Sequence, residues 1–204
     1  YFHHLNSSQA FAFNLFFPYF EQGTSLTLLH AMGLSGEASD WQPEYIDNLA
    51  EGTNIDVMWH AQDGARTFCE VKLSEQEFGA AKDDRRHRQK LEEIYKPVLE
   101  GHCAPELLEP AAFFSKYQLL RNVWLAAKEP SASVVFLVPR ANVALWPQLN
   151  PFIEQLAPAL GRRVHAVAIE DVLRTLASSD ESPPYLAWYA RLLQEKYVAH
   201  LTDS

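Results

Sequence analysis

The stretch GTNIDVMWHAQDGARTFCEVKLSEQEFG, residues 52–79, holds two short apolar runs on either side of a break that contains glycine. Runs rich in β-branched and aromatic residues, separated by such a break, predict two antiparallel strands joined by a hairpin. Each strand carries charge where apolar residues are expected: Asp56 in the first, Glu70 and Lys72 in the second. Burying a charged side chain is costly unless it is paired or bound to a metal. The three residues therefore predict a metal-dependent active site.

The length of the hairpin loop decides whether the two acids share a face of the sheet. Side chains alternate across a strand, and directly opposed residues of a pair point the same way. A three-residue loop at 62–64, with Gly64 in the left-handed conformation, sets Asp56 directly opposite Glu70. A two-residue loop sets Asp56 opposite Val71 and turns it to the other face. The predicted chemistry therefore requires the three-residue loop.

Two opposed carboxylates lie about 5 Å apart at their Cβ atoms and repel each other when both are ionised. A divalent cation removes this penalty, and two carboxylates completed by water suit Mg²⁺ or Mn²⁺ better than zinc. Lys72 could then position a water or offset charge on a phosphate oxygen. Phosphodiester hydrolysis is the reaction that fits this set. The alternative is a surface pair of Glu70 and Lys72 on an edge strand, with Asp56 capping a turn.

The rest of the chain predicts helices and two further strands around the hairpin. We expect one α/β domain over residues 1–204, built on a mixed β-sheet that combines an antiparallel meander with flanking helices. Residues 184–204 form a C-terminal helix that packs on this domain or at a dimer interface. The predicted order is a helix in 5–20 with Asn6 or Ser7 as its cap and its end near Pro18, a helix in 23–36 ending near Gly33 or Gly36, strands in 43–49, 54–60 and 65–73, a charged exposed helix in 74–96, a helix in 111–129, a strand in 132–139, a helix in 146–160, a strand in 162–173 and a helix in 183–201.

Composition limits the protein class. With 204 residues, 48% of them hydrophobic, the chain can bury a sizeable core. No apolar run reaches the roughly 20 residues that a membrane-spanning helix needs. The two cysteines, Cys69 and Cys103, are too few for a cysteine metal site and unlike a secreted disulfide framework. We expect a soluble protein of the reducing cytoplasm.

The formal charge of −9 argues at first sight against a polyanionic partner. The segment KDDRRHRQK, residues 82–90, is locally basic and offers Arg85, Arg86, Arg88 and Lys90 as candidate nucleic-acid contacts. The alternative is a solvated helix face. Histidine ligand pairs, a serine nucleophile elbow and glycine-rich phosphate loops are missing from the sequence, so zinc hydrolysis, triad chemistry and nucleotide-binding folds have little support.

The order of Asp56 and then Glu70-Val71-Lys72 after a hairpin resembles the core motif of the PD-(D/E)xK nuclease superfamily. The stretches NSSQAFAFNLF, EVKLSEQEFG and YQLLRN are similar to a bacterial restriction-endonuclease-like branch of it. The resemblance implies a restriction-endonuclease-like fold, with DNA as the substrate. It also implies that Asp56 and Glu70 ligate Mg²⁺ or Mn²⁺ and that Lys72 assists the attacking water.

The sequence departs from the superfamily pattern in two places. Ile55 stands where the motif's name has proline, and the first helix carries Gln9 where many members have a glutamate ligand. Glu44, on the preceding strand, is a candidate substitute for that acid, with a solvent-facing strand residue as the alternative. Gln118 in YQLLRN resembles a helix glutamine that some nuclease branches place near the active site, or it is a polar residue at a packed interface.

The hypothesis from these observations is a metal-dependent nuclease that hydrolyses phosphodiester bonds in DNA. The alternative is a nuclease-like fold without catalysis that serves as a nucleic-acid or protein interaction module. Cutting both strands of a duplex symmetrically generally requires two subunits, so the sequence leaves a homodimer open as one arrangement.

Overall fold

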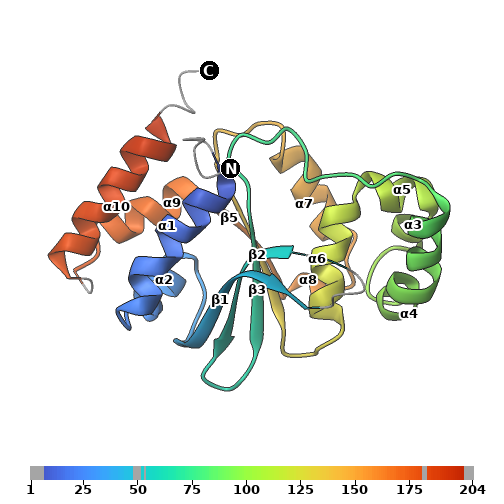
Figure 1. The fold of residues 1–204 in the computed structure, drawn as a ribbon, viewed down its shortest axis with the longest axis horizontal. Coiled ribbons are helices and arrows are strands. Elements are labelled where there is room, and N and C mark those ends of the chain that lie inside the picture. Colours follow the sequence, from blue (N-terminus) through green and yellow to red (C-terminus); the bar gives the residue numbers. More distant parts are fainter. Residues whose placement is uncertain (1–6, 48–51, 53, 181–182, 200–204) are drawn as a thin grey trace.

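A five-stranded mixed sheet lies at the centre of the molecule, with helices on both of its faces (Figure 1). The computed structural model describes residues 7–47, 52, 54–180 and 183–199. The strands follow the order β1-β2-β3-β4-β5. The first three pair antiparallel as a meander, whereas β4 pairs parallel to β3 and β5 parallel to β4. The predicted α/β class and meander are confirmed. The strands are β1 (Ala38–Ile46), β2 (Asn54–Ala61), β3 (Arg66–Val71), β4 (Ser133–Val138) and β5 (Val164–Ala168).

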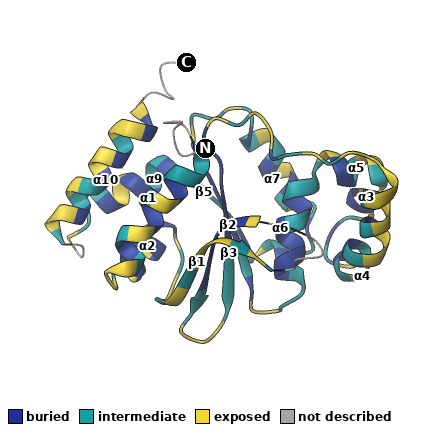
Figure 2. Cartoon of the chain, viewed as in Figure 1, coloured by how far each residue is buried: buried dark blue, intermediate teal, exposed yellow. Residues whose placement is uncertain are grey.

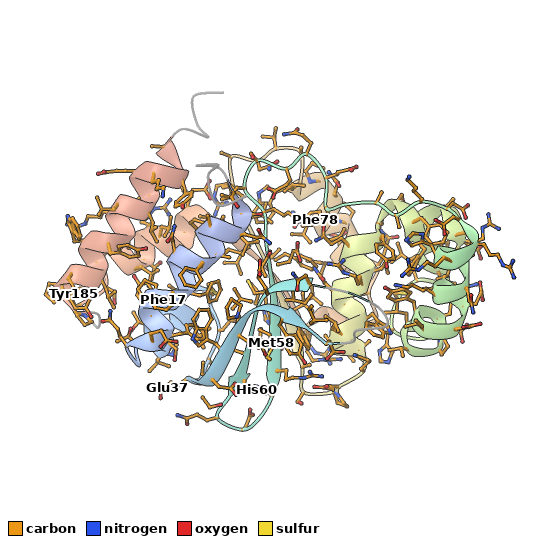
Figure 3. The ribbon with its side chains drawn as sticks, viewed as in Figure 1. Phe17, Glu37, Met58, His60, Phe78 and Tyr185 are labelled. Atoms are coloured by element: carbon orange, nitrogen blue, oxygen red, sulfur yellow. The ribbon has the colours of Figure 1, made fainter. Side chains whose placement is uncertain are left out.

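Two apolar cores separate the sheet from its two helical layers, and the sheet-facing sides of the helices are the buried ones (Figure 2). The stick view places Phe17 and Phe78 on opposite sides of the sheet (Figure 3). One layer contains α1 (Ser8–Glu21), α2 (Ser25–Ala31), α9 (Ile169–Ala177) and α10 (Pro184–Tyr197). The other contains α3 (Arg85–Lys90), a π-helical turn (Leu91–Tyr95), α4 (Lys96–Leu99), a 3₁₀ turn (Pro105–Leu108), α5 (Pro110–Ser115), α6 (Tyr117–Ala127), α7 (Trp146–Glu154) and α8 (Pro158–Gly161).

Helix α1 begins as predicted and ends later. The Ser7 side chain caps it by accepting the N–H of Ala10 at 3.3 Å, while Asn6, the other candidate cap, lies outside the described residues. The helix continues past Pro18 to Glu21, so the predicted end near Pro18 is wrong. Proline removes one helical hydrogen bond, but the next turn buries Tyr19 completely.

The segment 74–96 is not one helix. From Ser74 to Asp84 the chain has no helical turn, and α3 begins only where Asp84 accepts the N–H of His87 at 2.9 Å. Tertiary hydrogen bonds hold this segment out of a helix, because Asn142 Nδ2 donates to the carbonyls of Leu73 and Glu75 at 3.0 and 2.8 Å. These partners are distant in sequence, so local charge periodicity did not reveal them.

Three further boundaries differ from the predictions. Strand β1 starts at Ala38 rather than near residue 43. The helix predicted over 111–129 breaks at Lys116 into α5 and α6. The strand predicted over 162–173 ends at Ala168, where α9 begins with Glu170 and Asp171 in its first turn. Acidic residues in the first turn favour a helix N-terminus. The buried residues of this segment are spaced three to four positions apart, as expected for one face of a helix.

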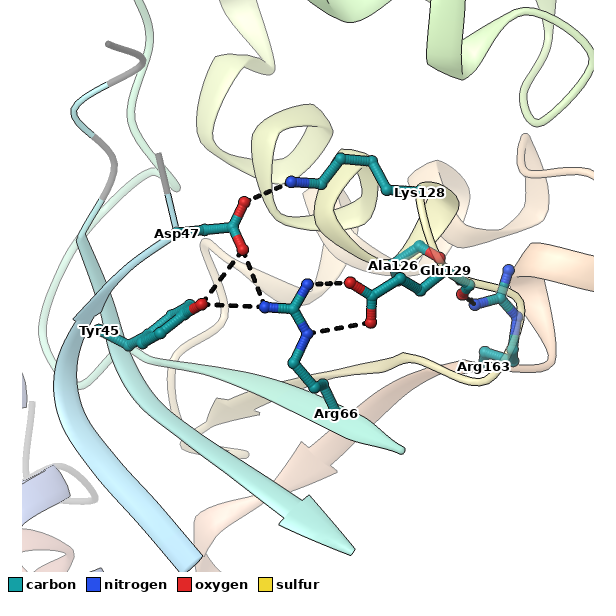
Figure 4. Close-up of polar contacts among 7 residues, drawn as sticks. All are labelled: Tyr45, Asp47, Arg66, Ala126, Lys128, Glu129 and Arg163. Atoms are coloured by element: carbon teal, nitrogen blue, oxygen red, sulfur yellow. Dashed lines mark hydrogen bonds and ion pairs between the residues drawn. The ribbon is translucent and has the colours of Figure 1, made fainter. Parts of the chain in front are cut away.

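An ion-pair network fastens the end of α6 to the sheet (Figure 4). Arg66, at the start of β3, donates to Tyr45 Oη and Asp47 Oδ1, both at 2.9 Å. The same guanidinium forms a two-point contact with Glu129, which follows α6. Lys128 pairs with the other oxygen of Asp47. Since α6 faces the centre of the sheet, this network sets the position of the side chains that α6 presents there.

Helix α10 packs on α1 and α9. Its inner face buries Leu186, Ala190, Leu193 and Tyr197, and Tyr197 Oη accepts Asn14 Nδ2 at 2.8 Å. Residues 200–204, the end of the segment predicted as this helix, lie outside the described residues. Within the described part of the chain no helix is both long enough and apolar enough to cross a membrane.

Candidate active site

The β2–β3 hairpin has the predicted register. Val57 pairs with Cys69 and Met58 with Phe68, so the next position along this register sets Asp56 against Glu70. The loop closes through Gly64, whose φ of 83° lies in the left-handed region. This confirms the three-residue loop on which the predicted chemistry depends.

The ladder between β2 and β3 ends one pair before the two acids. Asp56 Oδ2 accepts the backbone N–H of Val71 at 2.7 Å. The Asp56 carboxylate therefore accepts the N–H that a backbone carbonyl of β2 would accept if the ladder continued. Strand β3 continues on its other side, where Glu70 pairs with Phe136 and Val71 with Leu137 of β4. The candidate site therefore lies at a fork, where the two strands separate and leave room for a ligand.

Glu70 is the most tightly held residue of the site. Its side chain is buried, and Oε1 accepts Lys72 Nζ at 2.7 Å and Gln118 Nε2 at 2.5 Å. The other oxygen, Oε2, accepts Asn122 Nδ2 at 3.2 Å. Gln118 and Asn122 are four residues apart on α6, which places them on one face of the helix. Among the described residues, the donors to this carboxylate thus come from Lys72 and α6.

Asn122 was missed from the sequence, although its spacing from Gln118 in YQLLRN was a usable signal. Its side chain is buried, and its Oδ1 atom has no hydrogen-bond partner among the described residues. Gly79 holds Gln118 in place: a Cβ atom there would lie 2.9 Å from Gln118 Oε1, and its φ is 101°. A side chain at position 79 would displace the glutamine from Glu70.

The charge balance of the site favours a cation. Burial first, and then the carboxylate of Glu70, raise the pKa of Asp56 to about 7, against the opposing effects of the Val71 N–H and Lys72. Glu75, which follows Lys72 on the same segment, raises the pKa of Asp56 further. Negative charge near Asp56 is therefore only partly compensated, and a divalent cation would complete the compensation.

The donor set fits a hard divalent cation. Asp56 Oδ1 has no hydrogen-bond partner in the described part of the chain, so it is free to bind one. Among the described residues, no group of three or more His, Cys, Asp or Glu side chains gathers as a metal site. Two carboxylates, with water and substrate oxygens in the remaining positions, are a common protein contribution to Mg²⁺ sites.

Glu44 lies beside Asp56 in a strained conformation. Its φ of 49° makes it the one residue other than glycine with positive φ among those described. Its neighbours Pro43 and Tyr45 remain paired with β2, so Glu44 kinks the strand where it passes Asp56. Strain of this kind costs about 1–3 kcal/mol and gathers at functional sites.

A small pocket connects Glu44 to Asp56. It measures about 190 Å³ and is lined by Gln9, Phe13, Pro43, Glu44 and Asp56. Gln9 Nε2 donates to Glu44 Oε1 at 2.8 Å. Gln9, which stands where many members of the superfamily have the first-helix acid, is therefore hydrogen-bonded directly to Glu44, the candidate substitute for that acid.

The basic residues of segment 82–90 do not reach the carboxylates. The four candidate nucleic-acid contacts lie on α3, on the side of α6 away from the sheet (Figure 1). There His87 packs edge-on against Phe114 and Tyr117. Arg88 forms an ion pair with Asp83. Arg85 and Arg86 are exposed.

Residues 1–198 match the protein family described as "Restriction Endonuclease associating with ARP", and the chain belongs to this family. The mixed sheet with its flanking helices is a restriction-endonuclease-like fold, as the sequence predicted. No curated protein and no solved structure matches the chain.

Proposed function

We propose that this member of a restriction-endonuclease family is a Mg²⁺- or Mn²⁺-dependent nuclease of the PD-(D/E)xK type that hydrolyses phosphodiester bonds in DNA. The observation that carries the proposal is the fork between β2 and β3. It brings Asp56 and Glu70 together and keeps the Lys72 ammonium 2.7 Å from Glu70. Family membership supports the nuclease class, while the choice of DNA rests on the resemblance of the motif.

Each residue of the set has a proposed role. Asp56 and Glu70 would hold the cation, which when bound would supply a water of lowered pKa and positive charge beside the phosphate oxygens. Lys72 orients the attacking water or offsets charge that develops on the phosphate. Gln118 and Asn122 act as positioning residues, because their N–H groups fix the orientation of the Glu70 carboxylate.

Glu44 is proposed as the additional acid. It lines the same pocket as Asp56, and its strained backbone turns it toward that pocket. Because Gln9 occupies Glu44 Oε1, a cation or a water would use the other oxygen or displace the amide. Substitution of Glu44 by Gln should lower activity less than substitution of Asp56 or Glu70.

DNA held at the fork would extend toward α3. The exposed Arg85 and Arg86 are proposed to contact its phosphates, together with Arg88 and Lys90. Contacts of this kind add affinity without sequence preference. They are compatible with a net charge of −9, because four basic residues lie together on α3.

The experiment is a cleavage assay on supercoiled plasmid and on single-stranded DNA, with and without Mg²⁺ or Mn²⁺. Asp56→Asn and Lys72→Met should each remove metal-dependent cleavage, whereas the exposed Asp180→Asn should cut like the wild type. Thermal melting of each variant separates loss of chemistry from loss of fold. If the folded wild-type chain binds DNA but does not cleave it with either metal, the nuclease proposal is contradicted, and the alternative of an interaction module without catalysis takes its place.

A further inference from the structure

Three aromatic rings, two of them exposed and one half-buried, lie together on the outer side of α1 and β1. We call Phe13, Phe17 and Trp41 the aromatic strip. Phe13 and Phe17 are 40% and 44% exposed, and their rings stack with centroids 4.9 Å apart and an angle of 23° between planes. Trp41 lies 6.4 Å from Phe13 and 6.3 Å from Phe17.

The apolar core does not account for the two phenylalanines. Phe13 and Phe17 are one helical turn apart on the outer face of α1, while Phe11, Leu15 and Phe16 fill the core on its inner face. Large apolar rings that remain exposed together commonly mark a binding surface. The strip is thus available to a ligand.

The strip leads directly into the candidate active site. Phe13 lines the pocket of about 190 Å³ together with Glu44 and Asp56. A substrate whose phosphate reaches Asp56 would therefore have its neighbouring nucleoside beside the Phe13 ring. Continuity with the site favours a part of the substrate as the occupant of this surface.

Acidic side chains border the strip. Trp41 Nε1 donates to Glu21 Oε1 at 2.8 Å. Glu44 lies at the pocket end. Such a border repels phosphates, so it disfavours a ligand held by its backbone, and the base faces of a duplex are already covered by stacking. An unpaired base presents a neutral aromatic face, which an aromatic ring can cover.

We propose that the aromatic strip stacks an unpaired nucleobase next to the scissile phosphate, so that the substrate is single-stranded or locally unpaired nucleic acid. The inference rests on the proposed nuclease function and adds the strand form of its substrate. Phe13 is the specificity-determining residue, because it alone of the three rings lines the pocket with Asp56. Phe17 extends the stack outward.

The test measures binding by fluorescence anisotropy, with Ca²⁺ in place of Mg²⁺ so that the probe stays intact. The probes are a fluorescein-labelled single strand and the same sequence as a duplex. Phe13→Ala should weaken single-strand binding roughly 5- to 150-fold, the scale of one lost stacking contact, and Phe17→Ala should weaken it less. Phe13→Tyr should restore it. Tyr185→Ala removes an exposed aromatic side chain in the first turn of α10 (Figure 3), which belongs neither to the strip nor to the pocket, and should leave the affinity unchanged.

Three outcomes would contradict base stacking on the aromatic strip without contradicting the proposed nuclease function. One is wild-type cleavage with unchanged single-strand affinity in Phe13→Ala. Another is an equal loss for single strand and duplex. A third is a shift in size-exclusion elution of Phe13→Ala without any change in affinity, which would assign the surface to a second copy or another protein. Conversely, Phe13→Ala could lose single-strand binding selectively while the wild type cleaves no DNA. That result would support base stacking on the aromatic strip and contradict the proposed nuclease function.

Discussion

Replacing Asp56 with Asn should stabilise the metal-free protein at pH 8. The aspartate is largely buried beside Glu70, which raises its pKa from 3.8 to about 7. Asparagine is neutral and similar in shape, and its amide oxygen can still accept the N–H of Val71. The variant therefore keeps the hydrogen bond and loses the cost of burying a second negative charge.

The size and the sign of the effect follow from the pKa. A carboxyl group with a raised pKa in the folded state binds a proton that the unfolded chain has released, so it costs stability as the pH rises. The cost begins near pH 4, grows up to about pH 7 and is constant above it. A shift of this size corresponds to at most about 4 kcal/mol, and partial solvent exposure lowers it to about 2–4 kcal/mol.

The assay is urea unfolding in the presence of a chelator, at several values between pH 4 and pH 8. The free energy of unfolding of Asp56→Asn minus that of the wild type should rise with pH and level off above pH 7. Asp180→Asn, an exposed control, should give a difference near zero throughout. The reasoning is refuted if Asp56→Asn is less stable than the wild type at pH 8, or if the difference does not depend on pH.

Two further predictions concern the supports of the site, and a third concerns the proposed DNA contacts on α3. Gln118→Ala should lower the single-turnover rate about 10- to 100-fold with little change in the substrate concentration at half-maximal rate, because the amide only orients Glu70; an unchanged rate would remove its positioning role. Arg66→Met should lower the free energy of unfolding by about 1–3 kcal/mol in a urea titration, since Glu129 loses its two-point partner and Asp47 keeps only Lys128. A loss well below about 1 kcal/mol would contradict this. The double variant Arg85→Glu/Arg86→Glu should weaken DNA binding regardless of the DNA sequence. It should also reduce the slope of log affinity against log salt concentration by roughly 2. An unchanged slope would show that other residues contact the phosphates.

The hairpin that carries the site was predictable because its determinants are local. The apolar alternation around Asp56 and Glu70 sets the faces of the strands, and Gly64 supplies the left-handed residue that the three-residue loop requires. The buried run of β4 was equally readable, since a central parallel strand is apolar on both faces. Wherever a face of an element is buried, the short-range pattern of apolar residues was therefore enough to predict whether that element is a helix or a strand.

The supports of the site were not predictable from local pattern. Asn122 gains its role only when α6 lies over Glu70, and that position depends on ion pairs between segments far apart in the chain. The extended path of residues 74–84 is likewise imposed by Asn142 from the loop after β4. The strained backbone of Glu44 has no signature in the sequence, because residues other than glycine rarely take a positive φ and neither Pro43 nor Tyr45 requires one.

The most direct test of the account is a calorimetric titration of Mn²⁺ into the wild type, Glu70→Gln and Glu154→Gln. Glu154 is exposed on α7, so its variant is a matched control for the change of charge. We predict that the wild type and Glu154→Gln bind the metal equally and that a folded Glu70→Gln shows no saturable binding. Equal binding by all three proteins would contradict a metal site built on Glu70 and Asp56.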